Sequence, residues 1–399
     1  MLWAYLDEIN RAVINGTTTV LFSNDDAIIP ALIKSGIAEE DARDYVITGC
    51  WGLEICGKDF HDHGNYINLL KPFEFSIHHL EDKMEKVGLR FGYFDEAKTF
   101  EEVYAVCMEN FRILLEERAR VTREGGQIWD QVDVLPFISA THGDCVKNKK
   151  DYTSQGARYC YESYTCFGLP NIVDSLLAIK TLVFDQQKYT LSEFLSAVRN
   201  NWEGNEQMRL DATKCHGWGD NSDESNALAS RFHDDLARMV DHLQGGYGTG
   251  KVVLGYVTYT EIRFWGEQTL ATPDGRKNGE YFAQGLTPSR LKKIRSATDV
   301  VSSFFHLDAT SMAGNSVVNV ILPATKITLD VCEAFLRAVA TSAVQNLQLN
   351  VVTKEQLLDA QRHPEKYPHL IVRVCGFSAK FTSLSREWQD EFLSRNFYE

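Results

Sequence analysis

The chain has 399 residues, 44% of them hydrophobic, which is enough apolar material for a large packed core. Its formal net charge is −14 and it has no basic block, so nucleic acid and anionic membranes are poor partners. No apolar run approaches the roughly 20 residues that span a bilayer. The chain start lacks the basic region of a signal peptide, and the nine cysteines form no CxxC pair. We therefore expect a cytoplasmic protein with free thiols.

In the first half of the chain, helical and β-strand patterns alternate. An acidic cap at residues 24–26 predicts a helix that ends at Gly36, and a short apolar strand over residues 45–49 follows it. A capping box at residues 99–102 begins a long amphipathic helix. The apolar run over residues 134–141 predicts a buried strand.

The second half continues this alternation. Apolar runs over residues 317–323 and 347–352 predict strands, and each is followed by a capped helix. A β-prone run over residues 370–374 then leads to Gly376, and a helical pattern comes after it. Strands and helices in alternation predict an α/β, barrel-like fold.

Gly376 lies in the sequence Ile-Val-Arg-Val-Cys-Gly-Phe-Ser-Ala-Lys-Phe at residues 371–381. On structural grounds this glycine ends a strand in a conformation with positive φ. On chemical grounds a glycine α-carbon has no side chain, so a radical there can become planar and delocalise over both flanking amides. The chemical interpretation requires a matching cysteine elsewhere in the chain.

Cys50 is the candidate, because it follows Gly49 at the end of the short strand over residues 45–49. A cysteine beside an apolar run is ordinarily a small buried hydrophobic residue. In the chemical interpretation its S–H bond is similar in strength to the C–H bonds concerned, so a hydrogen atom can move in either direction near balance. Both interpretations are open at this point.

Several motifs together resemble the glycyl radical enzymes, the family of pyruvate formate-lyase and of the glycerol and choline lyases. These motifs are Gly-Cys at residues 49–50, Gly-Ala-Arg-Tyr at 156–159, Asn-x-x-Asp-Ser-Leu-x-Ala-Ile-Lys at 171–180, Ala-Thr-Pro-Asp-Gly-Arg at 271–276 and the segment 371–381. The resemblance implies that a radical S-adenosylmethionine activase removes a hydrogen atom from Gly376. It further implies that Cys50 then forms a thiyl radical and that no other cofactor is bound. It also implies an enzyme that works under anaerobic conditions, because the radical is oxygen-sensitive.

The resemblance extends over only the C-terminal half of family members, which are roughly twice as long. It implies the C-terminal half of a ten-stranded α/β barrel, with barrel residues 1–270 carrying the cysteine loop and a glycine radical domain at 271–399. Half a barrel exposes strand edges and apolar surface. We therefore expect an N-terminal-half subunit as a partner, besides the activase and a small-molecule substrate, and we expect a dimer.

The acid/base position departs from the family pattern, because most lyases of this family read Gly-Cys-x-Glu and this chain has Gly52 at the last position. The nearest carboxylate is Glu54, which a one-residue slip in the loop would bring to the site. Asp62 or His63 stands near the place where dehydratase-like relatives have a second acid/base group. A metal-dependent hydrolase that uses His61, Asp62 and His63 is an alternative, although a metal needs three or four converging ligands.

The resemblance implies a radical lyase, which is a dehydratase, a C–N or C–C eliminase or a decarboxylase acting on a small organic substrate. Acyl transfer of the pyruvate formate-lyase type needs two adjacent cysteines, and residues 48–51 contain only Cys50. Two further alternatives are a fumarate-adding synthase, which fits the missing glutamate, and a non-catalytic relic or scaffold of the same fold.

Overall fold

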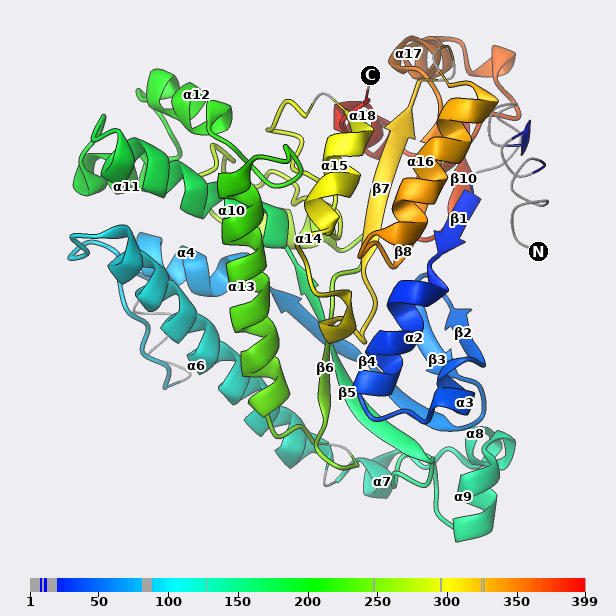
Figure 1. Cartoon of the computed structure of the whole chain (residues 1–399). Helices are drawn as coiled ribbons and strands as arrows, with labels where there is room; N and C mark the ends of the chain where they lie inside the picture. Colours follow the sequence, from blue (N-terminus) through cyan, green and yellow to red (C-terminus); the bar gives the residue numbers. More distant parts are fainter. Residues whose placement is uncertain are drawn as a thin grey trace.

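The computed structural model describes residues 8, 11–12, 20–80, 88–126, 128–246, 248–294, 296–323, 325 and 327–398, without the side chains of residue 20 and residues 61–64. Within these ranges, helices and strands alternate along the chain, which makes the fold α/β (Figure 1). Among the helices in these ranges, none is both long and apolar enough to cross a bilayer.

Five parallel strands form the centre of the fold. Strands β4, β5 and β6 pair in parallel, as do β7 and β8, and a parallel bridge between Tyr256 and Ser316 connects the two groups. Strand β1 adds an antiparallel edge to β8, and two hairpins, β2–β3 and β9–β10, complete the set. The strand bounds are β1 Val20–Ser23, β2 Tyr45–Thr48, β3 Gly52–Ile55, β4 Asp59–Asn68, β5 Tyr159–Phe167, β6 Val252–Gly255, β7 Val317–Leu322, β8 Asn346–Val351, β9 Ile371–Arg373 and β10 Ser378–Lys380.

The main hydrophobic core lies between these parallel strands and several long helices, among them α6, α10, α13 and α16 (Figure 1). The helix bounds are α2 Asp25–Lys34, α3 Glu39–Ala42, α4 Leu70–His78, α6 Phe100–Gly126, α7 Trp129–Val132, α8 Pro136–Thr141, α9 Gly143–Asn148, α10 Leu169–Ile179, α11 Leu191–Arg199, α12 Glu206–Lys214, α13 Asp223–His242, α14 Ile262–Glu267, α15 Ala297–Phe304, α16 Leu329–Thr341, α17 Lys354–Arg362 and α18 Arg386–Ser394; a π-helical turn, Lys180–Asp185, follows α10.

Strand β8 shows how the two faces of the sheet differ. All six of its residues are buried, yet apolar and amide side chains alternate along it. Leu347, Leu349 and Val351 join the main core, and because successive side chains point to opposite faces, Gln348 and Asn350 face the other way. The helix-facing side of the sheet is therefore apolar, and the opposite side carries buried amides.

The structure confirms the predicted strands over residues 45–49, 317–323 and 347–352 to within a residue or two at each end. The strand predicted over residues 134–141 is wrong, because this segment forms the short helix α8, in which the side chain of Phe137 is 90% exposed. A proline in its first turn favours the helix, since proline fixes φ at a helical value and lacks the N–H that a sheet would need.

The helical pattern expected after Gly376 is present as helix α18, but a short strand comes before it. The chain reverses at Gly376 and forms strand β10, which pairs antiparallel with β9. Gly376 has φ of +77°, a left-handed conformation that favours glycine and permits the tight reversal. Helix α18 begins only at Arg386.

Candidate active site

Cys50 lies in the turn of the β2–β3 hairpin. The hairpin is held to the sheet by its own apolar side chains, because Leu53 and Ile55 are buried in a cluster with Tyr161 and Val253. Trp51 is buried as well, and its Nε1 donates a hydrogen bond of 2.9 Å to the carbonyl oxygen of Thr258. These contacts fix the position of the half-buried thiol.

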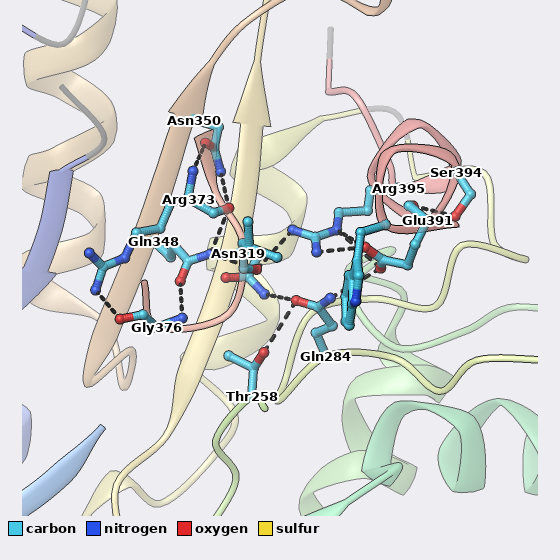
Figure 2. A network of polar contacts seen from close by, with 12 residues as sticks. Thr258, Gln284, Asn319, Gln348, Asn350, Arg373, Gly376, Glu391, Ser394 and Arg395 are labelled. Carbon is cyan, nitrogen blue, oxygen red and sulfur yellow. Dashed lines mark hydrogen bonds and ion pairs between the residues drawn. The ribbon is translucent and has the colours of Figure 1, made fainter. Parts of the chain in front are cut away.

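Gly376 lies in the turn of the β9–β10 hairpin, which rests on the amide side of β8 (Figure 2). The backbone N–H of Gly376 donates to Gln348 Oε1 at 3.2 Å, and the Gln348 amide donates to the carbonyls of Arg373 and Val374. Asn350 Oδ1 accepts from the backbone N–H of Arg373 at 2.8 Å. The Arg373 guanidinium in turn donates to the carbonyl oxygen of Gly376 at 2.8 Å. The backbone of this turn is therefore held by side chains of other residues.

The two turns meet. A Cβ atom placed on Gly376 would lie 2.5 Å from Cys50 Cβ, 2.8 Å from Trp51 Nε1 and 3.0 Å from Cys50 Cα, which is closer than real atoms approach. Since a C–C bond is about 1.5 Å long, the Gly376 α-carbon lies within about 4 Å of Cys50 Cβ. The structure thus brings the predicted glycine and cysteine into direct contact and leaves no room for a side chain at residue 376.

The surroundings of Cys50 keep its sulfur protonated. Burial raises the pKa of the Cys50 thiol above its ordinary value, the nearby Arg373 guanidinium acts in the opposite direction, and the Glu261 carboxylate raises the pKa further. A nucleophilic or metal-binding cysteine needs the opposite shift, toward the thiolate. This environment instead suits a thiol that gives and takes hydrogen atoms.

A second group of buried polar side chains connects the glycine turn with the C-terminal helix (Figure 2). Arg395 donates to the carbonyl of Val374 at 3.1 Å and forms a buried ion pair of 2.7 Å with Glu391. Gln284 donates to Glu391 at 3.1 Å and accepts hydrogen bonds from Thr258 and Asn319. Helix α18 therefore supports the residue that precedes Cys375 and Gly376.

The remaining predicted site residues are Glu54, Asp62 and His63. Glu54 Oε1 accepts a hydrogen bond of 2.6 Å from Thr48 Oγ1. Burial raises the pKa of Asp59, and the charge of Glu54 raises it further. Asp62 and His63 lie on strand β4 beside a register shift, but their side chains are outside the described part of the chain. The catalytic roles of all three stay predictions.

A metal site receives no support. Within the part of the chain that the structure describes, no three His, Cys, Asp or Glu side chains converge to hold a metal ion. The proposed ligands His61, Asp62 and His63 have side chains outside that part.

Three residues of this region escaped sequence reasoning, namely Gln348, Asn350 and Glu261. The first two left a signal, because amides that alternate with leucines in a buried strand must find hydrogen-bond partners. Glu261 left none, because nothing in its sequence context separates it from an ordinary surface glutamate.

The Ala-Thr-Pro-Asp-Gly-Arg motif at residues 271–276 forms a buried, hydrogen-bonded loop. The Arg276 side chain is buried, with 1% exposure, and donates to the carbonyls of Thr269 and Glu280. Asp274 accepts a hydrogen bond of 2.8 Å from Asn171 on helix α10. Arg276 therefore closes a loop that α10 holds in place.

Comparison with known proteins agrees with this geometry. The family model described as "Pyruvate formate lyase-like" matches residues 3–262, and the model described as "Glycine radical" matches residues 282–382. The chain is 27% identical to the (2S)-3-sulfopropanediol dehydratase of Klebsiella oxytoca over 93% of its own length and 46% of that protein. It is 29% identical to the isethionate sulfite-lyase of Nitratidesulfovibrio vulgaris over 98% of its own length and 49% of that protein.

Among solved structures, the glycerol-bound B12-independent glycerol dehydratase of Clostridium butyricum superimposes with a TM-score of 0.91 and 29% sequence identity. The superposition covers 99% of this chain and 51% of that one, so the chain spans about half the length of the relatives it matches. Because the first family model covers most of the chain and the second covers the segment around Gly376, the chain belongs to the pyruvate formate lyase-like family, the glycyl radical enzymes.

Proposed function

We propose that this chain carries the radical-bearing glycine and the hydrogen-transferring cysteine of a glycyl radical lyase. Gly376 stores the radical, which a radical S-adenosylmethionine activase generates by removing one hydrogen atom. Cys50 then gives its S–H hydrogen atom to Gly376 and becomes a thiyl radical. The thiyl radical takes a hydrogen atom from a small organic substrate, which loses a leaving group and recovers the hydrogen atom from Cys50.

The observation that carries this proposal is the contact between Gly376 and Cys50. A hydrogen atom moves between two centres only when they touch, and here the α-carbon abuts the cysteine side chain. The positive φ and the crowding at Gly376 have a structural explanation as a tight turn, but a tight turn does not require a cysteine beside it. A raised thiol pKa adds support, because it keeps the transferable hydrogen atom on sulfur.

Lyase chemistry is favoured over acyl transfer by the residues and by the relatives. The turn at residues 48–51 offers a single cysteine, and the similar proteins include a dehydratase and a sulfite-lyase. These relatives are about twice as long as this chain. We propose small molecules with a β-leaving group as its substrate class.

The test is electron paramagnetic resonance on protein co-expressed anaerobically with an activase. A glycyl radical keeps one α-hydrogen, so we expect a doublet that is absent in Gly376→Ala. Far-UV circular dichroism must accompany this variant, because its methyl group would collide with Cys50. No doublet in the wild type, or a doublet that survives in a folded Gly376→Ala variant, overturns the proposal.

A second measurement isolates the role of Cys50. In D2O the thiol becomes S–D, and reversible transfer exchanges the α-hydrogen of Gly376, so the doublet collapses to a singlet. We expect Cys50→Ala to form the radical and to retain the doublet in D2O. A collapse that proceeds equally fast in Cys50→Ala shows that another group exchanges the hydrogen atom.

We propose further that activity requires an N-terminal half that complements this chain. The known relatives are about twice as long, and strand β4 pairs on one side only within the described residues. Helices α7 to α9 next to β4 expose apolar side chains, among them Val132, Phe137 and Val146. Co-purification with a tagged N-terminal half tests this, and a Phe137→Ser, Val146→Ser variant should bind that half more weakly; unchanged binding contradicts this surface.

A further inference from the structure

Two tyrosines and a glutamate lie around Cys50. Tyr66 and Tyr259 are both half-buried, and their ring centroids are 5.4 Å apart with the rings inclined at 62°. Neither hydroxyl makes a hydrogen bond within the described part of the chain. Glu261 follows Tyr259 by two residues and its carboxylate accepts one weak hydrogen bond, of 3.4 Å, from Thr260.

The fold fixes this group next to the thiol through two contacts. Trp51, the residue after Cys50, donates its indole N–H to the carbonyl of Thr258 and so ties the cysteine turn to the segment that carries Tyr259 and Glu261. Cys50 and Tyr259 both pack against the small cluster of Trp51, Val257 and Val317. Glu261 stands directly before helix α14, whose backbone holds it in register.

The electrostatics agree with this placement. Burial is the largest cause of the raised pKa of Cys50, the Arg373 guanidinium acts in the opposite direction, and the charge of Glu261 raises the pKa further. Burial is also the largest cause of the raised pKa of Tyr66, and the charge of Glu261 raises that pKa further. The pKa of Tyr259 is raised by burial first and then by Tyr66, Cys50 and Glu261. The Glu261 carboxylate therefore contributes to the raised pKa values of Cys50, Tyr66 and Tyr259.

We propose that Glu261 is the catalytic acid/base of this site. It would take the role of a glutamate two residues after the cysteine, where this chain has Gly52. The proposal rests on the radical lyase function proposed above. In this role Glu261 would act on a substrate with a hydroxyl group on the carbon next to the one that bears the leaving group, with Tyr66 and Tyr259 as hydrogen-bond donors.

The step balances without an additional reactant. The Cys50 thiyl radical takes a hydrogen atom from the carbon that bears the hydroxyl group, which leaves S–H and a carbon radical. Glu261 accepts the hydroxyl proton, and the adjacent C–X bond breaks with its electron pair going to X. For a hydroxide leaving group the proton returns from Glu261 to give water. The remaining carbonyl-stabilised radical takes the hydrogen atom back from Cys50.

The decisive experiment compares Glu261→Gln with Glu267→Gln, a matched change at an exposed position at the far end of helix α14. Glycerol, isethionate and (2S)-3-sulfopropanediol serve as probes with the activated chain in complex with its N-terminal half. We expect Glu261→Gln to lower kcat on the converted probe by about 10²–10⁴-fold, as for loss of an acid/base group. The glycyl doublet and its collapse in D2O should persist. Wild-type kcat in Glu261→Gln, or loss of activity in Glu54→Gln alone, overturns the assignment.

A second readout does not need substrate. In the non-activated protein, the pH dependence of Cys50 alkylation by iodoacetamide, followed by mass spectrometry of its peptide, gives the thiol pKa. Arg373, Glu261, Tyr66 and Tyr259 are the titratable groups around it. Glu261→Gln should lower this pKa and Glu267→Gln should leave it unchanged. An unshifted pKa shows that the carboxylate does not face the thiol and also overturns the assignment, whereas a missing doublet in the wild type overturns only the underlying radical function.

Discussion

The β2–β3 hairpin and the β9–β10 hairpin meet at their turns but are held in opposite ways. The cysteine hairpin is anchored by its own apolar side chains, with Leu53 and Ile55 buried on either side of Glu54. The turn of the glycine hairpin is anchored through its backbone, which donates hydrogen bonds to the side chains of Gln348 and Asn350 and accepts one from Arg395 (Figure 2).

The difference follows from the chemistry at the two turns. A residue without a side chain cannot anchor itself, and the flanking amides of Gly376 are the groups over which a radical would delocalise. Neighbouring side chains must therefore fix those amides in place. Cys50 has a side chain to position, and ordinary packing of the residues around it suffices. Four predictions test this contrast, from the largest expected effect to the smallest.

Arg395→Met should be the most damaging of these changes. It leaves Glu391 as a buried, unpaired carboxylate and removes the donor to the Val374 carbonyl. Breaking one partner of a buried ion pair costs about 3–5 kcal/mol, so urea denaturation should show a loss of that size. The double variant Arg395→Met, Glu391→Leu should recover much of it, because no charge is left unpaired. A double variant as unstable as the single one would show that packing, and not the charge, is responsible.

Leu53→Ala should loosen the cysteine hairpin alone. Removing a buried leucine side chain costs about 2–5 kcal/mol, since it removes apolar contacts and leaves a cavity. Hydrogen exchange should accelerate at residues 49–52 and stay slow at residues 374–377. Equal acceleration in both turns would show that the two hairpins do not have separate anchors.

Gln348→Leu should give the opposite pattern of hydrogen exchange. It leaves the N–H of Gly376 and the carbonyl of Val374 without their amide partner, at a cost of about 1–3 kcal/mol. Exchange should accelerate at residues 374–377 while residues 49–52 stay protected. Gln361→Leu on α17 is the matched control, because the half-buried Gln361 amide bonds Asp390 and neither turn, and it should leave both turns unchanged. Normal protection of the glycine turn in Gln348→Leu would contradict anchoring through the backbone.

Asp59→Asn should have the smallest effect, and one that depends on pH. Burial, followed by the charge of Glu54, raises the pKa of Asp59 to about 6, against about 3.9 in an unfolded chain. Between these values the native state binds more protons, so this group makes stability fall as the pH rises from about 4 to about 6. Asp59→Asn should remove that dependence and stabilise the protein above pH 6 by about 1–2 kcal/mol. An unchanged pH dependence of the denaturation midpoint would show that Asp59 does not titrate in this range.

The sequence pointed to Gly376 and Cys50 as candidates because the motifs that resemble the glycyl radical enzymes are local strings of residues. Residue type alone left a structural and a chemical interpretation open for both. The strands over residues 45–49, 317–323 and 347–352 were predictable for a similar reason, since short apolar runs between turns have few other stable conformations. The same reasoning gave a wrong prediction for residues 134–141, because an apolar run does not reveal whether it is buried.

By itself, then, the sequence picked out Gly376 and Cys50 as the candidate pair for hydrogen exchange and predicted that strands and helices alternate around them. Only the tertiary structure decided that the two turns touch, that Gln348 and Asn350 hold the glycine backbone, and that Glu261 contributes to the raised pKa of the thiol. The physical reason is the distance over which each effect acts. Residue type and periodicity act over a few positions, whereas contact and electrostatic effects depend on distances in space between segments that are far apart in the chain.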